Sequence, residues 1–229
     1  MRVAIVGGTG DLGFGLALRL GAKGVDVVIG SRAAERADQA ASRALERLGQ
    51  GASVSGGENP DAVSGAELVF VSVPYAGQAD IYRSLKGHLA PGVIVCDTTT
   101  PLATAVGGRA TQVLRPWHGS AAEQARALLP DEARMVAGFQ SVGAEPLEDL
   151  EHDVDADVLL CGDDAEAKAS VGSLVDLIPG LRWVDCGPLS MARIVEPLTA
   201  VLISVNKRYG VKGAGVRLSG RERWGAPGG

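Results

Sequence analysis

Cysteine, histidine and aromatic residues are scarce in this sequence, and no block of positive charge occurs. Its 229 residues include three cysteines and three histidines, with no Cys-x-x-Cys pair and no histidine near a cysteine at the spacing of zinc ligands. A disulfide framework and a metal site are therefore not expected. The net charge of −5 argues against nucleic acid as a partner, because binding to a phosphate backbone needs a basic face.

The sequence also lacks an apolar run of about 18 residues, the length that crosses a bilayer as a helix. The first residues, MRVAIVGG, are too short and too rich in glycine to form a signal peptide. We expect a soluble, cytoplasmic protein without a membrane partner. With 46% hydrophobic residues, the chain can form one large domain, or one domain and a small companion, around a sizeable core.

Short apolar runs alternate along the chain with stretches rich in alanine and leucine. The strand-like runs are RVAIV, VDVVIG, ELVFVSV, GVIVCD and ARMVAGF, and the helix-like segments cover 12–22, 33–48, 78–89 and 120–129. Because the runs are apolar on both faces, they are typical of a parallel sheet that helices cover on both sides. The pattern predicts an α/β fold with a doubly wound parallel sheet.

A smaller α/β unit is predicted to follow the sheet, and we place the boundary between 1–141 and 142–229. The acidic stretch GAEPLEDLEHDVDAD predicts a surface excursion, and after it come a strand VLLCG, a helix, a strand RWVDC and a last helix from Ser190. Apolar residues of the last helix recur at three- and four-residue spacing, which makes one broad face that covers its own chain or meets a second subunit. Pro197 should kink this helix. The face consists of Met191, Ile194, Val195, Leu198, Val201, Leu202 and Val205.

Local signals mark helix starts and one long loop. Ser120 and Glu123 form a capping-box pattern, and we interpret Asp163 and Asp164 as the cap of the helix that follows them. The stretch 99–119 shows no periodicity. A loop of that length in a compact domain predicts a functional segment.

A glycine cluster, GGTGDLG, directly follows the first strand-like run. Gly8, Gly10 and Gly13 satisfy G-x-G-x-x-G at the point where a first strand meets a first helix. Glycines at these positions permit a tight turn, let the backbone approach a pyrophosphate and allow the helix to pack closely on the strand, while the helix N-terminus faces the negative charge. We interpret the cluster as a dinucleotide site on a Rossmann-type sheet.

The end of the second strand indicates which dinucleotide binds. Enzymes that prefer NAD usually place an acidic residue about 20 positions beyond the glycines. This strand ends instead in SRAAER, which supplies Ser31, Arg32 and Arg36. A guanidinium pairs with phosphate oxygens and a hydroxyl can add a hydrogen bond, whereas cations at a helix start are unfavourable unless an anion is present. The segment favours NADP(H) over NAD(H).

The glycines also fit a second spacing, Gly7-x-x-Gly10-x-x-Gly13, which is found in atypical short-chain dehydrogenases and in non-catalytic relatives that sense NADP. The sequence contains a Tyr-x-x-x-Lys pair, Tyr82 and Lys86, but it follows VFVSVP on the third crossover, so we treat it as coincidence. No Ser/His/Asp or Cys/His arrangement marks a catalytic side chain. Hydride exchange between two bound cofactors requires mainly their positioning, so this sparsity fits hydride transfer.

Several stretches resemble the F420-dependent NADP reductases (NADPH:F420 oxidoreductases). These are GGTGDLGFGLALRL, GSR with a basic residue at 36, CGDDAEAK and DCGPLSMARIVEPLT, and the resemblance runs from Met1 to about Leu218. It implies an NADP-binding Rossmann domain over 1–141 and a smaller C-terminal domain over 142–229 that completes the pocket. It also implies a homodimer and reversible hydride transfer between NADP(H) and the deazaflavin coenzyme F420, with these small-molecule cofactors as the substrates.

The resemblance further implies where the cofactors bind. The glycine turn would cradle the pyrophosphate, the end of the second strand would hold the 2′-phosphate, the turns after the later strands would flank the nicotinamide, and the segment GAGVRL would form a wall against the deazaflavin. The implied cofactor-binding residues are Gly8, Thr9, Gly10, Asp11, Leu12, Gly13, Ser31, Arg32, Arg36, Val73, Pro74, Tyr75, Thr100, Gln140, Ala144 and Ala214.

One position departs from the family pattern. Where the family commonly has a histidine after the strand VAGF, this chain has Gln140. Glutamine can donate a hydrogen bond but does not titrate near neutral pH. The departure leaves two alternatives open. The first is an NADPH-dependent reductase of another acceptor, such as a flavin, a metal chelate or a small carbonyl. The second is a non-catalytic NADP(H)-binding sensor.

Overall fold

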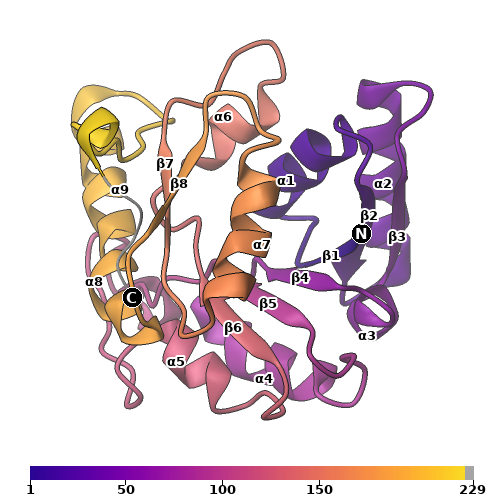
Figure 1. Cartoon of the computed structure of the whole chain (residues 1–229), viewed down its shortest axis with the longest axis horizontal. Coiled ribbons are helices and arrows are strands. Elements are labelled where there is room, and N and C mark those ends of the chain that lie inside the picture. The colour runs from indigo at the N-terminus through magenta and orange to yellow at the C-terminus, as the bar shows by residue number, and fades with distance from the viewer. Residues whose placement is uncertain (225–229) are drawn as a thin grey trace.

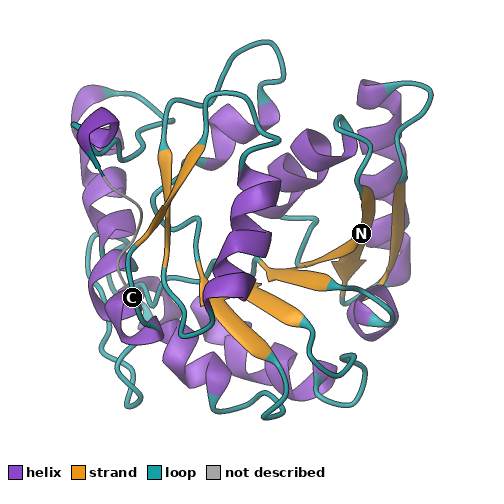
Figure 2. Cartoon of the chain, in the orientation of Figure 1, coloured by secondary structure: helices purple, strands orange, loops and turns teal. Residues whose placement is uncertain are grey.

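The computed structural model describes residues 1–224, and a parallel six-stranded sheet forms its centre (Figures 1 and 2). The strand order is β3-β2-β1-β4-β5-β6 and every pair is parallel. This is the strand order of the Rossmann fold, and it confirms the predicted doubly wound sheet. The order reverses between β1 and β4, which opens a crevice at the carboxyl ends of these strands. The strands are β1 (Arg2–Val6), β2 (Asp26–Ser31), β3 (Val54–Glu58), β4 (Leu68–Val71), β5 (Ile94–Asp97) and β6 (Arg134–Ala137).

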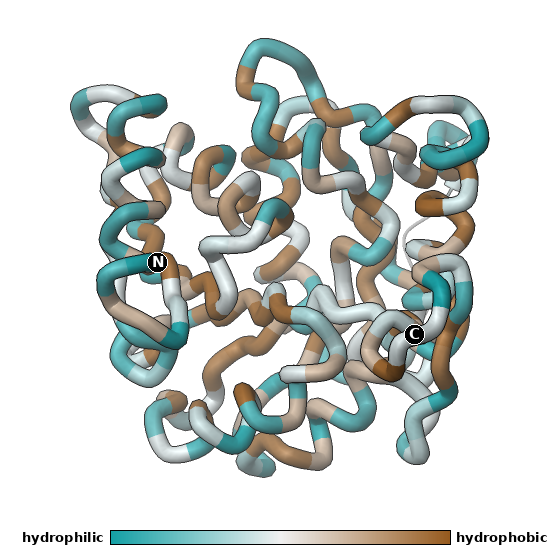
Figure 3. The backbone as a smooth tube through the Cα atoms, turned by 180° about the vertical axis from the view of Figure 1, so that it is seen from behind, coloured by the Kyte–Doolittle hydropathy of each residue, from teal (hydrophilic) through white to brown (hydrophobic). Residues whose placement is uncertain are grey.

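Helices cover both faces of the sheet, because successive strand residues point to opposite sides. Val3 and Ile5 of β1 belong to the core beneath α1 (Asp11–Gly21), α2 (Ala34–Leu48) and α7 (Ala165–Val175). Ala4 and Val6 belong to the opposite core, beneath α3 (Asn59–Val63), α4 (Tyr75–Leu85) and α5 (Ala121–Arg126). All four of these β1 side chains are fully buried. In Figure 3 the central strands are accordingly hydrophobic while the outer turns are mostly hydrophilic.

The edge strand β3 and the short helix α3 after it were not predicted from the sequence. The strand reads VSGGE and is only partly buried, and glycine lowers the tendency of a segment to form a strand. The structure gives a reason for the glycine at position 56. A Cβ on Gly56 would lie 2.4 Å from the backbone carbon of Ala37, so α2 could not pack this closely on β3.

The expectation that the acidic stretch after residue 141 is a surface excursion is wrong in part. The short helix α6 (Ala144–Glu148) packs on α1, and Leu147 is fully buried. A Cβ on Gly15 of α1 would lie 2.6 Å from the Leu147 side chain. Arg19, which is 4% exposed, donates hydrogen bonds to the backbone oxygens of Leu147 at 3.0 Å and of His152 at 2.8 Å. The buried guanidinium therefore anchors a segment that is acidic in sequence.

A second, two-stranded parallel sheet consists of β7 (Asp157–Leu160) and β8 (Arg182–Asp185). It joins the large sheet through a bridge in which the backbone N–H groups of Ala137 and Cys161 donate to each other's oxygens at 2.8 and 3.0 Å. Asp164 caps α7, as predicted, by accepting the Ala167 N–H at 2.9 Å. Asp163 does not cap this helix, and its carboxylate accepts the N–H of Leu189 instead.

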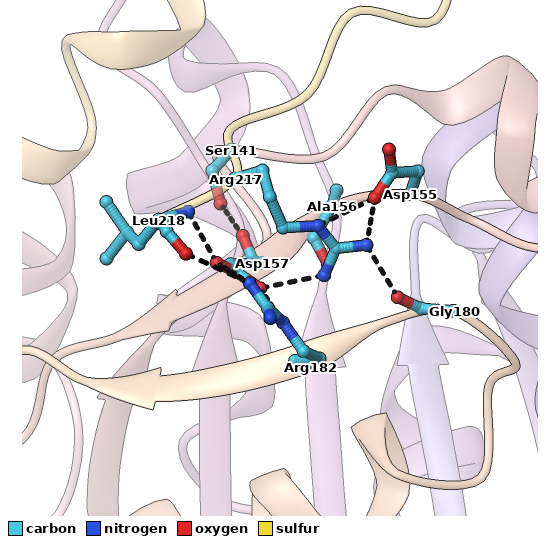
Figure 4. A network of polar contacts seen from close by, with 8 residues as sticks. All are labelled: Ser141, Asp155, Ala156, Asp157, Gly180, Arg182, Arg217 and Leu218. Atoms are coloured by element: carbon cyan, nitrogen blue, oxygen red, sulfur yellow. Dashed lines mark hydrogen bonds and ion pairs between the residues drawn. The ribbon is translucent and has the colours of Figure 1, made fainter. Parts of the chain in front are cut away.

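A network of charged groups holds the C-terminal tail on β7 (Figure 4). The fully buried Asp157 accepts two hydrogen bonds from the Arg182 guanidinium, at 2.7 and 2.8 Å, and one from Arg217 at 2.9 Å. It also accepts the Leu218 N–H at 2.7 Å. The Ser141 hydroxyl donates to the backbone oxygen of Asp157 at 2.7 Å. The tail is thereby tied to the segment that leaves β6.

The last helical stretch is kinked at Pro197, as predicted, and divides into α8 (Ala192–Val195) and α9 (Leu198–Tyr209). Its apolar face is only partly covered, since Ile194 is 64% and Val201 is 55% exposed. By length and composition alone, Leu189–Tyr209 would suffice to cross a membrane, since an 18-residue window within it has a mean hydropathy of 1.3. Of that window, 28% is buried.

Three single turns of 3-10 helix complete the described elements. They are η1 (Ala103–Val106), η2 (Leu189–Met191) and η3 (Arg221–Arg223).

Candidate functional site

Two adjoining cavities lie at the point where the strand order reverses. The larger has a volume of about 600 Å³ and the smaller one of about 400 Å³. Both are lined by Gly10 at the start of α1 and by Ser72, Val73 and Pro74 after β4. The carboxyl ends of strands beside such a reversal are where open α/β sheets bind ligands. The cavities therefore form two halves of one site.

The glycine turn between β1 and α1 gives the two cavities their shared floor. Gly7 has φ +74°, and a Cβ there would lie 2.4 Å from the backbone oxygen of Ser72, so the turn requires a glycine at this position. At Gly13 a Cβ would lie 2.8 Å from the Cα of Gly8, which shows that α1 packs tightly on the turn. Gly10 is different, because the nearest atom to a Cβ there is 3.5 Å away. Its open side faces the cavities, which leaves the backbone accessible to a ligand.

The smaller cavity carries the cationic groups predicted for a 2′-phosphate. Arg32 and Arg36 line it and are exposed, and within residues 1–224 neither forms an ion pair. Ser31 is 6% exposed, and its Oγ accepts the Ala33 N–H at 3.4 Å. The two guanidinium groups lie at the N-terminus of α2, where cations are unfavourable without an anion. The arrangement fits a phosphate group.

The sequence reasoning missed Asn59 as a residue of this cavity. It lines the smaller cavity at the start of α3, is 4% exposed, and its Oδ1 has no hydrogen-bond partner among the described residues. The omission follows from the unpredicted strand β3. Asn59 directly follows the carboxyl end of β3, and the carboxyl ends of parallel strands are where such sheets bind ligands.

The larger cavity gathers most of the residues implied for the ring end of the site. They come from the glycine turn and from the segments after β4, β5 and β6, and all project from the same edge of the sheet. Their members are Gly10, Asp11, Leu12, Val73, Pro74, Tyr75, Thr100, Gln140 and Ala144. Thr9, with Gly10, Ser31, Arg32, Arg36, Val73 and Pro74, lines the smaller cavity.

Three of the implied residues line neither cavity. Gly8 and Gly13 lie behind the turn and shape it. Ala214 lies on the C-terminal tail, where its N–H donates to Oδ1 of Asn206 at 3.0 Å. The neighbouring Gly213 approaches Gly143, whose Cβ would lie 3.2 Å from the Gly213 Cα. Ala214 is therefore placed behind the turn that bears Ala144.

Thr199 of α9 also lines the larger cavity and was not predicted. Its hydroxyl donates to the backbone oxygen of Gln140 at 2.8 Å and lies 2.8 Å from the Thr100 hydroxyl. The spacing of apolar residues in the last helix predicts its hydrophobic face and gives no signal for Thr199. α9 thus contributes directly to the site.

Gln140 enters the site from a strained segment of backbone. Phe139 before it has φ 73°, an uncommon value for a bulky residue, and its ring packs edge-on against Phe70 at 5.6 Å between centroids. Gln140 is 4% exposed, and its Nε2 donates to the backbone oxygen of Asp97 at 3.0 Å. Strain of this kind persists where the surrounding packing enforces it, and such positions cluster at functional sites.

A buried carboxylate at the end of β5 organises the wall behind the larger cavity. Asp97 is fully buried and accepts the Tyr82 hydroxyl at 3.1 Å and the Thr99 N–H at 2.6 Å. Burial raises the pKa of this carboxyl, although the hydrogen bonds it accepts oppose the shift. Tyr82 is fully buried and lines neither cavity, which agrees with treating the Tyr82 and Lys86 pair as coincidence.

A second buried carboxylate, Glu196, lies at the N-terminus of α5. Its two oxygens accept the N–H groups of Ala121 and Ala122, each at 2.9 Å. Burial raises the pKa of Glu196 to about 8, against the effect of these two hydrogen bonds, and the charge of Asp97 adds to the rise. The helix begins as predicted, because Ser120 Oγ accepts the Glu123 N–H at 3.0 Å.

No cluster of three or more histidine, cysteine or carboxylate side chains that could hold a metal ion occurs in residues 1–224. The three cysteines are free thiols, with Cys96 and Cys161 buried. His88, His118 and His152 are exposed. The polar lining of the two cavities consists of backbone, hydroxyl, amide and guanidinium groups and of the carboxylates of Asp11 and Asp80.

Comparison with known proteins places nearly the whole chain beside one kind of enzyme. A family described as "NADP oxidoreductase coenzyme F420-dependent" matches residues 2–101. The chain is 45% identical to the F420-dependent NADP reductase of Methanocaldococcus jannaschii, over 97% of this chain and 100% of that protein. It is 39% identical to the F420-dependent NADP reductase of Methanothermobacter thermautotrophicus, over 96% of this chain and 95% of that protein.

A solved structure shares the fold over the same extent. It is a protein of Arthrobacter sp. FB24, provisionally described as an F420-dependent NADP reductase. It superposes with a TM-score of 0.80 and 26% sequence identity, covering 96% of this chain and 100% of that one. The fold is thus shared over nearly the whole chain.

Proposed function

Because this chain belongs to the family of F420-dependent NADP reductases, we propose that it transfers a hydride reversibly between NADP(H) and coenzyme F420. The observation that carries the proposal is the pair of adjoining cavities. One end presents Arg32 and Arg36 to a phosphate, and the other is a larger space bordered by Tyr75, Thr100 and Gln140. A dinucleotide lying across the glycine turn would reach from one to the other.

The residues of the turn fit a pyrophosphate. Gly10 leaves the backbone open toward the cavities, and the N-terminus of α1 begins directly after it, at Asp11. Backbone N–H groups at a helix start favour a bound anion. At the far end of the smaller cavity, the hydroxyl of Ser31 and the two guanidinium groups supply donors that match phosphate oxygens.

The described side chains act on the reaction by positioning the two rings. When bound, the reduced nicotinamide supplies a hydride and the deazaflavin accepts it. Val73, Pro74 and Tyr75 form one wall of the larger cavity, and Thr100 and Gln140 border it from the ends of β5 and β6. Holding donor and acceptor in a productive orientation supplies much of the rate in such a transfer, because translational and rotational freedom is already lost on binding.

In our proposal the two parts of the chain have different roles in binding the substrates. Residues 1–141 bind the nucleotide, and residues 142–229 complete the pocket in which the acceptor ring lies. Support comes from Ala144 and Thr199, which line the larger cavity from beyond the boundary. The tail that bears Ala214 would reinforce this wall from behind.

We further propose that the protein is a homodimer that pairs through the α8 and α9 face. Ile194 and Val201 are more than half exposed there, and Leu198 and Leu202 are only partly covered. An exposed apolar face of this kind marks an interaction site. Sedimentation of the wild type and of Val201→Asp tests this proposal: a dimer that the substitution converts to monomer supports it, and a monomeric wild type contradicts it.

The proposed substrates are phosphate-bearing, water-soluble cofactors, which supports the expectation of a cytoplasmic enzyme without a nucleic-acid or membrane partner. The acidic net charge of −5 supports the expectation for nucleic acid.

The first experiment follows the visible absorbance of oxidised F420 mixed with purified protein and NADPH, with NADH and FMN run in parallel. Rapid loss with NADPH and F420 supports the proposal and shows that Gln140 is compatible with it. Reduction of FMN but not F420 would favour another acceptor, which is the alternative that Gln140 motivates. Tight NADPH binding without any acceptor reduction would favour a sensor.

A further inference from the structure

A chain of side-chain hydrogen bonds connects the wall of the larger cavity to the buried Asp97. The Tyr75 hydroxyl donates to Oε1 of Gln124 at 3.0 Å, and Nε2 of Gln124 donates to Oε1 of Gln78 at 3.1 Å. Nε2 of Gln78 in turn donates to Oδ2 of Asp97. The chain runs from α4 to α5, back to α4 and then to the end of β5, elements that lie close together in Figure 1.

The direction of every donor in this chain follows from the two acceptors at its end, the Asp97 carboxylate and the backbone oxygen of Ala121. A backbone oxygen only accepts hydrogen bonds, and Nε2 of Gln78 donates to the Ala121 oxygen at 3.1 Å as well as to Asp97, so Gln78 must turn its NH₂ group toward both. Its oxygen then faces Gln124, which must offer its own NH₂ group. The remaining oxygen of Gln124 faces Tyr75, whose hydroxyl must donate. The hydroxyl proton of Tyr75 is thereby used in a hydrogen bond within the protein, so the Tyr75 oxygen can only accept a hydrogen bond from a ligand.

The backbone oxygen of Asp97 also fixes the orientation of a second side chain that lines the cavity, Gln140. A carbonyl oxygen also only accepts, so Nε2 of Gln140 is held by the Asp97 oxygen at 3.0 Å. The opposite end of the amide, Oε1, is buried and has no hydrogen-bond partner among residues 1–224. A buried acceptor without a partner is costly, and a donor that pairs with it is correspondingly favoured.

We propose that Asp97 and the backbone oxygen of Ala121 together set the polarity of the larger cavity, so that Tyr75 and Gln140 present hydrogen-bond acceptors and select a ring whose edge carries N–H groups. The inference rests on the proposed function, since two such edges occur in its substrates. One is the carboxamide of the nicotinamide, and the other is the imide of the deazaflavin. Both offer an N–H beside a carbonyl group.

Analogues that lack the N–H separate these two sources. In the 3-acetylpyridine analogue of NADP an acetyl group of nearly the same size replaces the carboxamide, so the carbonyl stays and the N–H is lost. In N3-methyl F420 a methyl group replaces the imide hydrogen and adds bulk, so for this analogue only a change of the binding ratio between the wild type and the variants reports the hydrogen bond. Dissociation constants for each analogue and its parent are measured by fluorescence titration, which needs no turnover. A failure to reduce F420 would overturn the proposed function and leave this measurement intact.

A matched pair of substitutions at Gln124 tests the relay itself. Gln124→Glu loses the NH₂ group that donates to Gln78 but keeps an oxygen for the Tyr75 hydroxyl, whereas Gln124→Leu removes both and frees the hydroxyl to donate into the cavity. Gln124 lines neither cavity, so a change in ligand preference must pass through Tyr75. Tyr75→Phe, which removes the oxygen altogether, provides a second test if Gln124→Leu folds poorly, and Gln140→Leu tests the other acceptor.

We expect the wild type to bind at least one analogue about tenfold more weakly than its parent, as for the loss of one hydrogen bond in a buried site. Gln124→Glu keeps that ratio. The ratio falls toward one in Gln124→Leu and Tyr75→Phe if Tyr75 receives the N–H, or in Gln140→Leu if Gln140 does. Equal binding of both analogues and their parents by the wild type overturns the inference, as does a ratio that survives all three of these substitutions.

Discussion

Glu196 accepts the backbone N–H of Ala121 at 2.9 Å, although 75 positions separate the two residues. The contact ties the kink of the last helical stretch to the start of α5 and buries a carboxyl group whose pKa is raised to about 8, chiefly by desolvation. In the unfolded chain that pKa returns to its ordinary value near 4.5. The folded protein therefore binds a proton at Glu196 that the unfolded chain has already released.

This difference predicts a stability that falls as pH rises. Between about pH 4.5 and pH 8 the native state holds more protons at Glu196 than the unfolded state, so the free energy of unfolding decreases, by at most about 1.4 kcal/mol per pH unit. Above pH 8 the contribution is flat. Urea unfolding of the wild type and of Glu196→Gln at pH 5.5, 6.5 and 7.5 measures it. Asp97 stays in both proteins, so their difference reports Glu196 together with its electrostatic interaction with Asp97, and parallel curves would contradict the prediction.

Arg32 is expected to distinguish NADPH from NADH. Replacing it with alanine removes a guanidinium from the smaller cavity, and a hydrogen bond to a charged group contributes about 1.5 to 3 kcal/mol. We expect the KM for NADPH to rise about tenfold to a hundredfold, with little change for NADH. Steady-state kinetics with both coenzymes measure it. Arg47→Ala is the control, because Arg47 lies on the same helix and contacts Glu148. An equal effect on both coenzymes would remove the 2′-phosphate assignment.

Gly10 and Gly13 should respond in opposite ways to alanine. At Gly10 the added methyl group would lie 3.5 Å from its nearest neighbour, the backbone oxygen of Gly7, which is ordinary van der Waals contact, and the backbone has φ −84°. Gly10→Ala should therefore fold with a Tm close to that of the wild type. The methyl group lies on the cavity side and should weaken NADPH binding. At Gly13 it would lie 2.8 Å from the Cα of Gly8, so we expect Gly13→Ala to lower the Tm. Thermal melts and NADPH titrations separate the two effects, and a destabilised Gly10→Ala would contradict this geometry.

The sequence predicts a strand well where both faces of the sheet are buried. Strands such as RVAIV are apolar on both faces because both faces are covered, and this pattern is visible without a structure. The edge strand β3 has no such pattern, since VSGGE is half exposed and contains two glycines. The glycine that makes VSGGE look unlike a strand is what lets α2 approach it.

Gly10 and Arg32 could be located from the ends of the first two strands, whereas Gln140 was implied by the family resemblance, and all three line the two cavities. The residues that were missed enter the site by tertiary contact. Asn59 depends on the unpredicted β3, and Thr199 reaches the cavity from a helix 99 positions after Thr100. The sequence also did not predict that Arg19 anchors the acidic stretch. Its guanidinium binds backbone oxygens of that stretch, and no residue pattern indicates such contacts.

The pair of Asp157 and Arg182 should decide the stability of the C-terminal part. Burial alone would raise the pKa of Asp157, but the hydrogen bonds from Arg182, the Leu218 N–H and Arg217 outweigh it and lower the pKa. Asp157→Asn leaves two guanidinium groups beside a neutral amide. The Arg182 and Arg217 side chains are 36% and 31% exposed, so water can solvate the two guanidinium groups. The cost is then that of losing hydrogen bonds to a charged group, and we expect a loss of about 1.5 to 3 kcal/mol in urea unfolding at pH 7.

The same network predicts a dependence on acid. Because the folded pKa of Asp157 is depressed, its contribution is fully present above the ordinary value near 3.8 and is lost as pH falls through the folded value. Asp157→Asn should therefore differ from the wild type by a constant amount between pH 5 and 7 and converge with it only in stronger acid. Asp80→Asn is the control, since Asp80 and its partner Arg83 are exposed on α4 and such pairs contribute little. If Asp157→Asn were no less stable than Asp80→Asn, the tail would be held by its backbone hydrogen bonds alone and the charged network would be dispensable.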